Sequence, residues 1–309
     1  MFKPLQLRFR GTVGGTIPID ATGGEVFDYA VPDTTEIYRY HVFSVTSQFV
    51  VNKISNKFND IEYLVVAGGG AGGAADNEQE AGSGGGAGGF RQGGELLTSA
   101  GIVSVRVGGG GSGRGGKGNC VPGLPGAQSY VGTFSSAGGG GGLCARTGNP
   151  GGIANGGSGG GGSERSATAG TGNIPATVPR QGYNGTIDYV DGPNWNSWRT
   201  YGGGGGGASS NGLNSSGGQP AASTVFTSEI KGAYLSTYSK DVGVGTSPVF
   251  SRGGRGGQRT YNGGQPGASY SGNGGQGGRA QGEGYQGYQQ MNPGGNGGSG
   301  IVVIKYRIQ

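Results

Sequence analysis

The sequence predicts a mostly β and irregular protein, with a small β-rich N-terminal module followed by a bundle of polyglycine-II helices framed by β-strands. Glycine supplies 81 of the 309 residues and hydrophobic residues only 31%, so a conventional apolar core is not expected over most of the chain. β-rich runs nonetheless flank the glycine-rich part, and its tracts repeat every three residues. These observations predict two domains, residues 1–60 and 61–309.

The N-terminal module, residues 1–60, is predicted to contain several short strands. Apolar residues alternate with polar ones from Tyr38 to Val45, and a second apolar run covers residues 49–51. Alternation with a period of two is typical of a strand with one buried face. A small β module is therefore expected here.

Three later runs are also predicted to be strands. Residues 61–67 lead directly into a glycine tract, residues 102–107 lead into another, and residues 300–306 follow the last one. All three are rich in β-branched residues. We expect the runs 61–67 and 300–306 to pair and close the domain. Strands that open directly into glycine tracts also argue against the low-complexity disorder that such a composition otherwise indicates.

The glycine tracts follow an X-Gly-Gly repeat, seen in residues 252–258, 273–279 and 293–299. A polyproline-II-type helix has three residues per turn, so this repeat places every X side chain on one edge and leaves two edges of bare backbone. Because such helices make no internal hydrogen bonds, their backbone groups are free to bond to neighbouring helices. A collagen triple helix is not expected, since pure glycine runs such as 202–207 interrupt its period.

Inserts without glycine repeats separate the tracts, and we predict that they form loops at the ends of the glycine helices. Aromatic residues are frequent in some of these inserts. The inserts are residues 74–81, 163–201, 221–250 and 281–291.

The sequence indicates no enzyme, no cofactor and no metal site. Residues 111–118 nearly match a phosphate-binding loop, but Gly118 stands where Ser or Thr must hold magnesium. His41 is the single histidine, and we expect it to pack in the structure. The carboxylates that a glycosidase would need are interpreted as surface-loop residues: Glu164, Asp188 and Asp191.

Cysteine content and charge place weaker bounds on the chain. Cys120 and Cys144 lack the paired spacing of zinc or redox sites, and one disulfide or two free thiols are both compatible with the sequence. The net charge of +5 is spread over a chain with only 13% charged residues, which permits an anionic partner without requiring one. No apolar run approaches the roughly 18 to 20 residues of a membrane span, so no membrane insertion is expected.

The order of several segments resembles the glycine-rich domain of phage tail-fibre-like proteins. The resemblance covers about residues 20–309 and is carried by residues 21–24, 38–43, 61–70, 86–91, 102–107, 138–142, 156–160 and 297–304. The sequence is also similar in style to the adhesins of T-even-type phage long tail fibres, whose glycine tracts form a sandwich of polyglycine-II helices with receptor-binding loops. It departs from those adhesins by carrying the β-rich residues 1–60 directly before the glycine domain.

This resemblance implies a virion surface protein in which residues 1–60 attach and the loops of residues 61–309 bind the host. The implied partners are a host cell-surface receptor, protein or glycan, and other virion proteins, with multiple copies per particle. It implies synthesis in the host cytoplasm, and the N-terminus has no apolar run of signal-peptide type. A virion structural or capsid decoration role without receptor binding is the first alternative.

Aromatic residues are the candidate receptor contacts. Both tryptophans of the chain fall within one polar insert, where they would suit stacking on sugar rings or filling a receptor pocket. Packing against the flat glycine face is the competing interpretation. The candidates are Tyr183, Tyr189, Trp195, Trp198, Tyr201, Tyr285 and Tyr288.

A second alternative is binding of single-stranded nucleic acid. Tyrosines between residues 261 and 288 alternate with Arg255, Arg259 and Arg279, a composition typical of RGG-type segments. Such segments are usually disordered and do not end in a strand like residues 301–306, so nucleic acid is not the expected partner. Ice binding ranks lower still, because the X positions do not form a regular Thr or Ala array.

Overall fold

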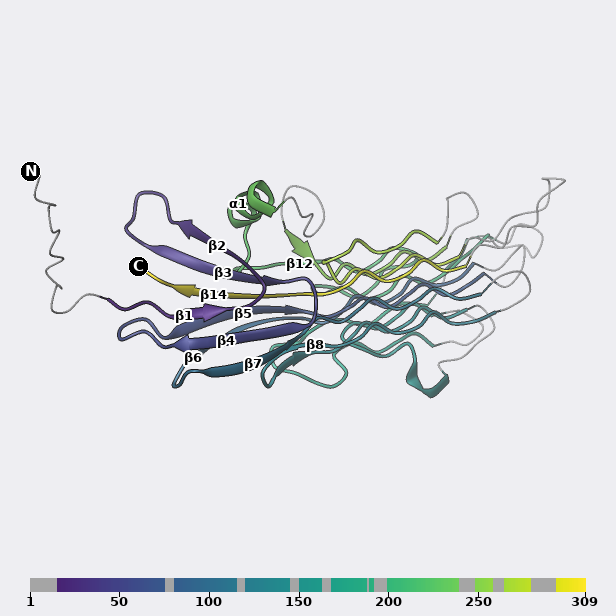
Figure 1. The fold of residues 1–309 in the computed structure, drawn as a ribbon. Helices are drawn as coiled ribbons and strands as arrows, with labels where there is room; N and C mark the ends of the chain where they lie inside the picture. Colours follow the sequence, from purple (N-terminus) through teal and green to yellow (C-terminus); the bar gives the residue numbers. More distant parts are fainter. Residues whose placement is uncertain are drawn as a thin grey trace, which may run out of the picture.

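The computed structural model shows an elongated protein with a β-sandwich at one end and a parallel array of glycine tracts at the other (Figure 1). It describes residues 16–75, 81–115, 120–144, 150–162, 168–187, 189–191, 199–238, 248–257, 264–278 and 293–309. The described chain is mostly β and irregular, with one short α-helix, α1 (Ser228–Tyr238), and one 3-10 turn, η1 (Pro150–Gly152).

Two five-stranded antiparallel sheets form the sandwich. The first sheet has the order β1 (Asp20–Thr22), β4 (Ser47–Lys53), β7 (Gly101–Arg106), β8 (Ser129–Val131) and β9 (Phe134–Ser136). The second has the order β2 (Glu25–Ala30), β3 (Ile37–Phe43), β14 (Ile301–Arg307), β5 (Asp60–Val66) and β6 (Phe90–Leu96). Two small antiparallel pairs complete the strands: β10 (Tyr189–Asp191) with β11 (Arg199–Tyr201), and β12 (Ala221–Ala222) with β13 (Val249–Phe250).

The main apolar core lies between the two sheets. Side chains alternate along β14, so that Val302, Ile304 and Tyr306 contribute to this core while Val303 lies on the opposite face of the sheet. Phe49 of β4 is fully buried on the other side of the core. Because β14 pairs with both β3 and β5, the C-terminal strand is the centre of the second sheet.

The predicted pairing of the β-rich run 61–67 with the run 300–306 is confirmed. β5 and β14 pair antiparallel, from Ile301 with Val66 to Tyr306 with Ile61. The sheets do not follow the expected division at residue 60, however, because each contains strands from both sides of it. The strands of residues 20–53 are divided between the two sheets, where they pair with later strands and share one core.

A helix covers the outer face of the second sheet. The expectation that insert 221–250 forms only a loop is wrong for residues 228–238, which form α1. Phe226, just before α1, and Ile230 and Tyr234 within it are each no more than 4% exposed and pack against the apolar outer face of the sheet. Their spacing of four residues places Ile230 and Tyr234 on one side of the helix, so burial of that side stabilises α1.

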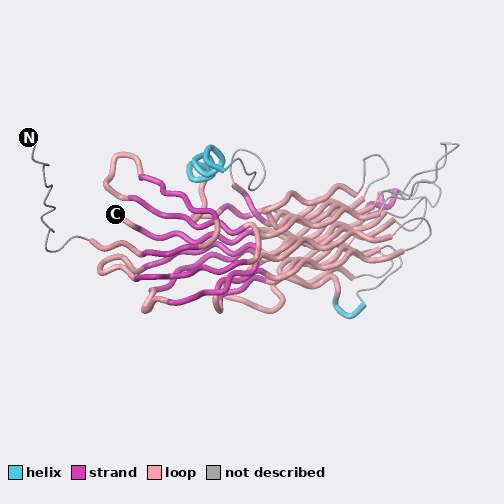
Figure 2. Tube along the Cα trace, viewed as in Figure 1, coloured by secondary structure: helices cyan, strands magenta, loops and turns pink. Residues whose placement is uncertain are grey.

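The described glycine tracts are extended segments outside the β-strands, and they bond laterally to one another (Figure 2). In residues 68–74 successive amides donate to three different neighbouring tracts, and each neighbour recurs every third residue. Gly68, Ala71 and Ala74 donate to Ala127, Leu124 and Val121; Gly69 and Gly72 donate to Gly298 and Gly295; Gly70 and Gly73 donate to Gly86 and Ser83. Tract 68–74 is therefore held on three sides by backbone hydrogen bonds, which compensate for the missing apolar core.

Close approach of the tracts explains why the sequence is so rich in glycine. A methyl group on Gly70 would overlap the carbonyl group of Gly140, and one on Gly72 would overlap the carbonyl group of Gln276. The same overlap would arise at most interior glycines of the array. Packing of one backbone directly on the next thus leaves no space for a side chain at these positions.

The structure joins Cys120 and Cys144 in a disulfide, one of the two states that the sequence left open. The bond links the returning tract 120–128 to the outgoing tract 138–144, which also share backbone hydrogen bonds from Gly123 to Gly142 and from Gly126 to Gly139. The disulfide therefore fastens two tracts that the backbone already holds together.

Removing this cross-link is expected to lower stability without changing the fold. We predict that the double variant Cys120→Ala/Cys144→Ala loses about 3 kcal/mol, because closing a loop of this length restricts the unfolded chain. Thermal unfolding followed by circular dichroism, with and without reductant, measures the loss. Wild-type protein in reductant should approach the midpoint of the variant. An unchanged midpoint in both cases would show that the cross-link contributes nothing.

Candidate functional site

The glycine tracts end together at the side of the array remote from the sandwich, here called the distal end (Figures 1 and 2). Described residues near the ends of several tracts bond directly to one another there. Gly73 donates to Ser83, Gly278 to Gly73, Gly82 to Gly278, Gly257 to Gly82 and Gly202 to Gly257, at N···O distances of 2.8 to 3.1 Å. The described residues that precede the connections 76–80, 258–263 and 279–292 therefore meet at this end, whereas the connections themselves lie outside the described residues.

The small hairpin of β10 and β11 also precedes a tract that starts at the distal end. Tyr189 and Tyr201 are directly opposite each other in its register, so the structure brings two of the candidate contact residues together on neighbouring strands. Trp195 and Trp198 belong to the hairpin connection 192–198, which lies outside the described residues. The sequence places all four in one insert but does not predict the hairpin.

The other aromatic candidates are distributed differently. Tyr183 lies at the opposite end of tract 183–187 from the hairpin, where its ring stacks under the guanidinium group of Arg180 at 4.6 Å, and its amide donates to Gly207. Tyr285 and Tyr288 fall in the connection 279–292, outside the described residues. Tyr183 is therefore separated from Tyr189 and Tyr201.

Insert 221–250 does not belong to the distal end in its described part. Val225 and Phe226 are buried against the sandwich, and β12 and β13 pair beside it. Among the described residues of this insert, the apolar side chains thus serve packing and not presentation at the distal end.

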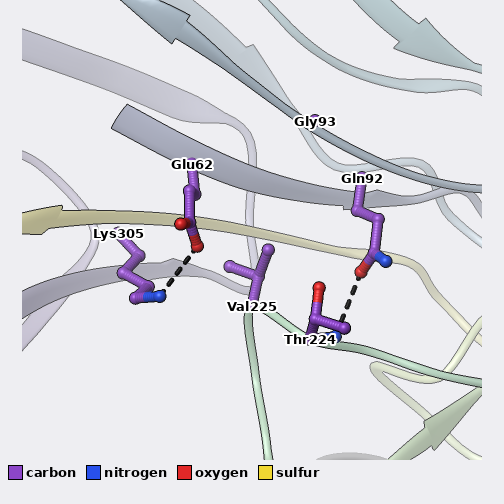
Figure 3. A pocket seen from close by; sticks show the side chains of 6 residues that line it. All are labelled: Glu62, Gln92, Gly93, Thr224, Val225 and Lys305. Carbon is purple, nitrogen blue, oxygen red and sulfur yellow. Dashed lines mark hydrogen bonds and ion pairs between the residues drawn. The ribbon is translucent and has the colours of Figure 1, made fainter. Parts of the chain in front are cut away.

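A polar cavity of about 310 Å³ lies where this insert meets the second sheet. Figure 3 shows Val225 between two polar pairs. In the first pair, Nζ of Lys305 lies 2.7 Å from Oε2 of Glu62. In the second, the backbone amide of Thr224 donates to Oε1 of Gln92 at 3.2 Å. The one carboxylate and the one ammonium group already pair with each other. No nucleophile stands next to a base in this cavity, so it lacks the arrangement of a covalent catalyst.

A family model for a glycine-rich domain matches residues 44–307. The chain belongs to this glycine-rich domain family. The match spans β4 to β14 together with the whole array of glycine tracts, so most of both sandwich sheets lies within the family domain. A comparison with curated proteins finds no match.

The near match to a phosphate-binding loop lies within one tract of this glycine-rich domain. The amide of Gly111 donates to Gly69, and that of Gly113 donates to the side chain of Asn296. A phosphate-binding loop needs its amides turned toward a ligand. Residues 116–118 lie outside the described residues; the described amides that precede them instead hold tracts together. No group of three or more metal-ligating side chains occurs in the described part of the chain, and no helix there has the length and apolarity of a membrane span.

The single histidine of the glycine-rich domain protein packs in the core, as the sequence predicted. His41 is fully buried; its Nδ1 lies 2.7 Å from the carbonyl oxygen of Gly23, to which it donates, and its Nε2 accepts from the hydroxyl of Tyr306 at 2.9 Å. Phe49 contacts the edge of the ring. Burial lowers the pKa of His41 below its ordinary value of 6.5, so the neutral ring is the stable form.

Stability is therefore expected to fall as the pH is lowered below about 6.5, by up to about 1.4 kcal/mol per pH unit. The unfolded chain binds a proton at His41 in this range, whereas the folded chain resists it until the pH reaches the lowered pKa. Urea unfolding between about pH 5 and 7 measures the slope, and His41→Gln should flatten it. A slope that persists in this variant would assign the pH dependence to other groups.

Proposed function

We propose that this protein is a bacteriophage virion surface protein of the tail-fibre adhesin type, whose distal end binds the surface of the host cell. The observation that carries the proposal is that the ends of several glycine tracts meet at one end of an elongated molecule, with the sandwich at the other. Loops presented by a rigid scaffold are where binding residues usually lie. The proposed role is binding, without catalysis.

The scaffold in this proposal is a polyglycine-II bundle. The recurrence of the same neighbouring tract at every third amide, as in residues 68–74, supports a helix with three residues per turn. The overlap that a methyl group would create on Gly70 or Gly72 supports backbone packing without side chains. Such a bundle keeps its structure when the connecting loops change, because most of its hydrogen bonds join backbone atoms of the tracts.

Aromatic side chains of the hairpin region are the proposed receptor contacts. Tyr189 and Tyr201 share one register position, and the connection between their strands carries Trp195 and Trp198. Aromatic rings bury large areas at low entropic cost and stack on sugar rings. Tyr285 and Tyr288, in a connection that departs from the same end, are proposed to add to this surface. Several copies per particle, held by other virion proteins, would raise the total affinity.

Competition for adsorption tests this function. Purified full-length protein is expected to reduce adsorption of the phage to its host cells, and the double variant Trp195→Ala/Trp198→Ala is expected to reduce it much less at an unchanged thermal midpoint. If the variant still blocks adsorption fully but has lost stability, the tryptophans pack against the bundle and are not contacts. If the wild-type protein has no effect although purified particles contain it, the adhesin role is excluded in favour of a structural or decoration role.

A further inference from the structure

Charge is distributed unevenly between the two parts of the molecule. In the sandwich, three basic side chains pair with acidic ones: Arg39 with Asp28, Lys305 with Glu62, and Arg307 with Glu36, each at 2.7 Å. In the described part of the glycine array the sole acidic residue is Asp191, which stands opposite Arg199 in the register of the hairpin. Four further arginines of the described array have no acidic counterpart there: Arg114, Arg180, Arg252 and Arg255.

Arg252 and Arg255 form an exposed ridge on the tract 251–257. Both arginines are exposed, while the glycines between and after them are buried. They occupy successive X positions, so about 9 Å separates their Cα atoms along the tract. Neither guanidinium group makes an ion pair or side-chain hydrogen bond with the described residues.

Amide and hydroxyl side chains flank this ridge on both sides. On one side the amides of Gly274 and Gly277 donate to the carbonyl oxygens of Arg252 and Arg255 at 2.9 Å, which places the half-exposed Gln276 beside the ridge. On the other side Gly253 and Gly256 donate to the tract 215–219, which carries the exposed residues Ser216 and Gln219. The surface is therefore cationic along its centre and polar at both margins.

From this surface we infer a binding site for an anionic polysaccharide, lying along tract 251–257 with its acidic groups on Arg252 and Arg255. Guanidinium groups bind carboxylates and phosphates through paired hydrogen bonds, and the flanking amides and hydroxyls both donate to and accept from sugar hydroxyls. The regular spacing of the arginines suits a polymer with repeating charges. The inference goes beyond the distal contacts and rests on the proposed function only in placing the polymer on a cell surface.

Single-stranded nucleic acid fits the described surface less well. Proteins that bind it without sequence preference combine a basic groove with aromatic rings on which bases stack. Among the described residues nearest the ridge no side chain is aromatic: Gln276 borders it on one side, and Ser216 and Gln219 on the other. Polar side chains that suit sugar hydroxyls occupy the positions where stacking rings would be needed.

Retention of the full-length protein on immobilised polygalacturonate tests the inference, with dextran as the uncharged polymer and an immobilised DNA oligonucleotide as the competing polyanion. The test variant is Arg252→Gln/Arg255→Gln. The matched control, Lys53→Gln/Arg106→Gln, removes the same charge from exposed residues of the sandwich. Thermal midpoints of both variants should equal that of the wild type, because all four side chains are exposed.

We expect the wild type and the control to bind polygalacturonate in a salt-dependent manner, the test variant to bind about tenfold more weakly, and none of them to bind dextran. Absence of wild-type binding, or equal weakening in both variants, would overturn the site. If the wild type were retained more tightly on DNA than on polygalacturonate, and if only the test variant lost this retention, the ridge would be reassigned to nucleic acid. None of these outcomes changes the expected result of the adsorption test of the distal end. Failure of the polysaccharide site can therefore be distinguished from failure of the proposed function.

Discussion

Replacing Gly110 by alanine is expected to destabilise the protein by more than about 3 kcal/mol, whereas alanine at the adjacent Gly109 should change stability by less than about 1 kcal/mol. A methyl group on Gly110 would overlap the carbonyl group of Gly297, part of a neighbouring backbone that cannot move away without breaking its own hydrogen bonds. A methyl group on Gly109 would have no heavy atom within 4 Å. The two residues share one tract, so the intrinsic preference of alanine is similar at both.

Thermal and urea unfolding of the two single variants measures this difference, and soluble yield provides a second indication. Because Gly109→Ala controls for any general intolerance of alanine in the tract, only the position of the methyl group separates the variants. Similar stabilities for both would contradict the close packing of the tracts. A further variant at a fully enclosed position, Gly70→Ala, should behave like Gly110→Ala.

Removal of the C-terminal strand is expected to prevent folding of the sandwich. A chain that ends at Gly300 lacks β14, the central strand of the second sheet, and leaves the paired edges of both β3 and β5 open. It also loses Val302, Ile304 and Tyr306 from one core and Val303 from the other. Since the loss of one large core side chain alone commonly costs 2 to 5 kcal/mol, the loss of the strand exceeds the stability of an ordinary domain.

The control for this truncation is a chain that lacks Gln309 alone, which loses the hydrogen bonds of this residue with Ile37 and Arg307 but retains β14. Far-ultraviolet circular dichroism and gel filtration distinguish the outcomes. The control should remain folded and monodisperse, whereas the chain ending at Gly300 should aggregate or unfold. A folded truncated chain would show that the glycine array is stable without closure of the sandwich.

The sequence was sufficient to predict the strands at residues 61–67, 102–107 and 300–306, because each is an apolar run bounded by glycine. It did not predict β6, since Phe90–Leu96 contains two glycines and two charged residues and is ordered by pairing with β5. The helix α1 was missed for a related reason: Gly232 and a weakly apolar composition hide it. The one helical signal in this segment is the four-residue spacing from Ile230 to Tyr234.

The candidate contact site was predictable in composition but not in arrangement. The sequence places Tyr189 and Tyr201 in one insert. The pairing of β10 with β11 depends on the positions of the adjoining glycine tracts and is seen only in the structure. Tyr183 belongs to the same insert yet lies at the other end of a tract, because the extended segment that starts there carries the chain toward the distal end. The sequence likewise shows Arg252 and Arg255 as part of an X-Gly-Gly repeat. It does not show that they are exposed, because exposure depends on which edge of the tract faces solvent.

The most direct test of the account is whether the molecule binds host cells with its distal end. Protein biotinylated at the C-terminus can be compared on beads with protein coupled through Ser197→Cys in the hairpin connection, since the native cysteines are paired in a disulfide. We predict that beads coupled through the C-terminus capture host cells and that beads coupled through residue 197 capture few. Equal capture by both, or capture only through residue 197, would contradict it.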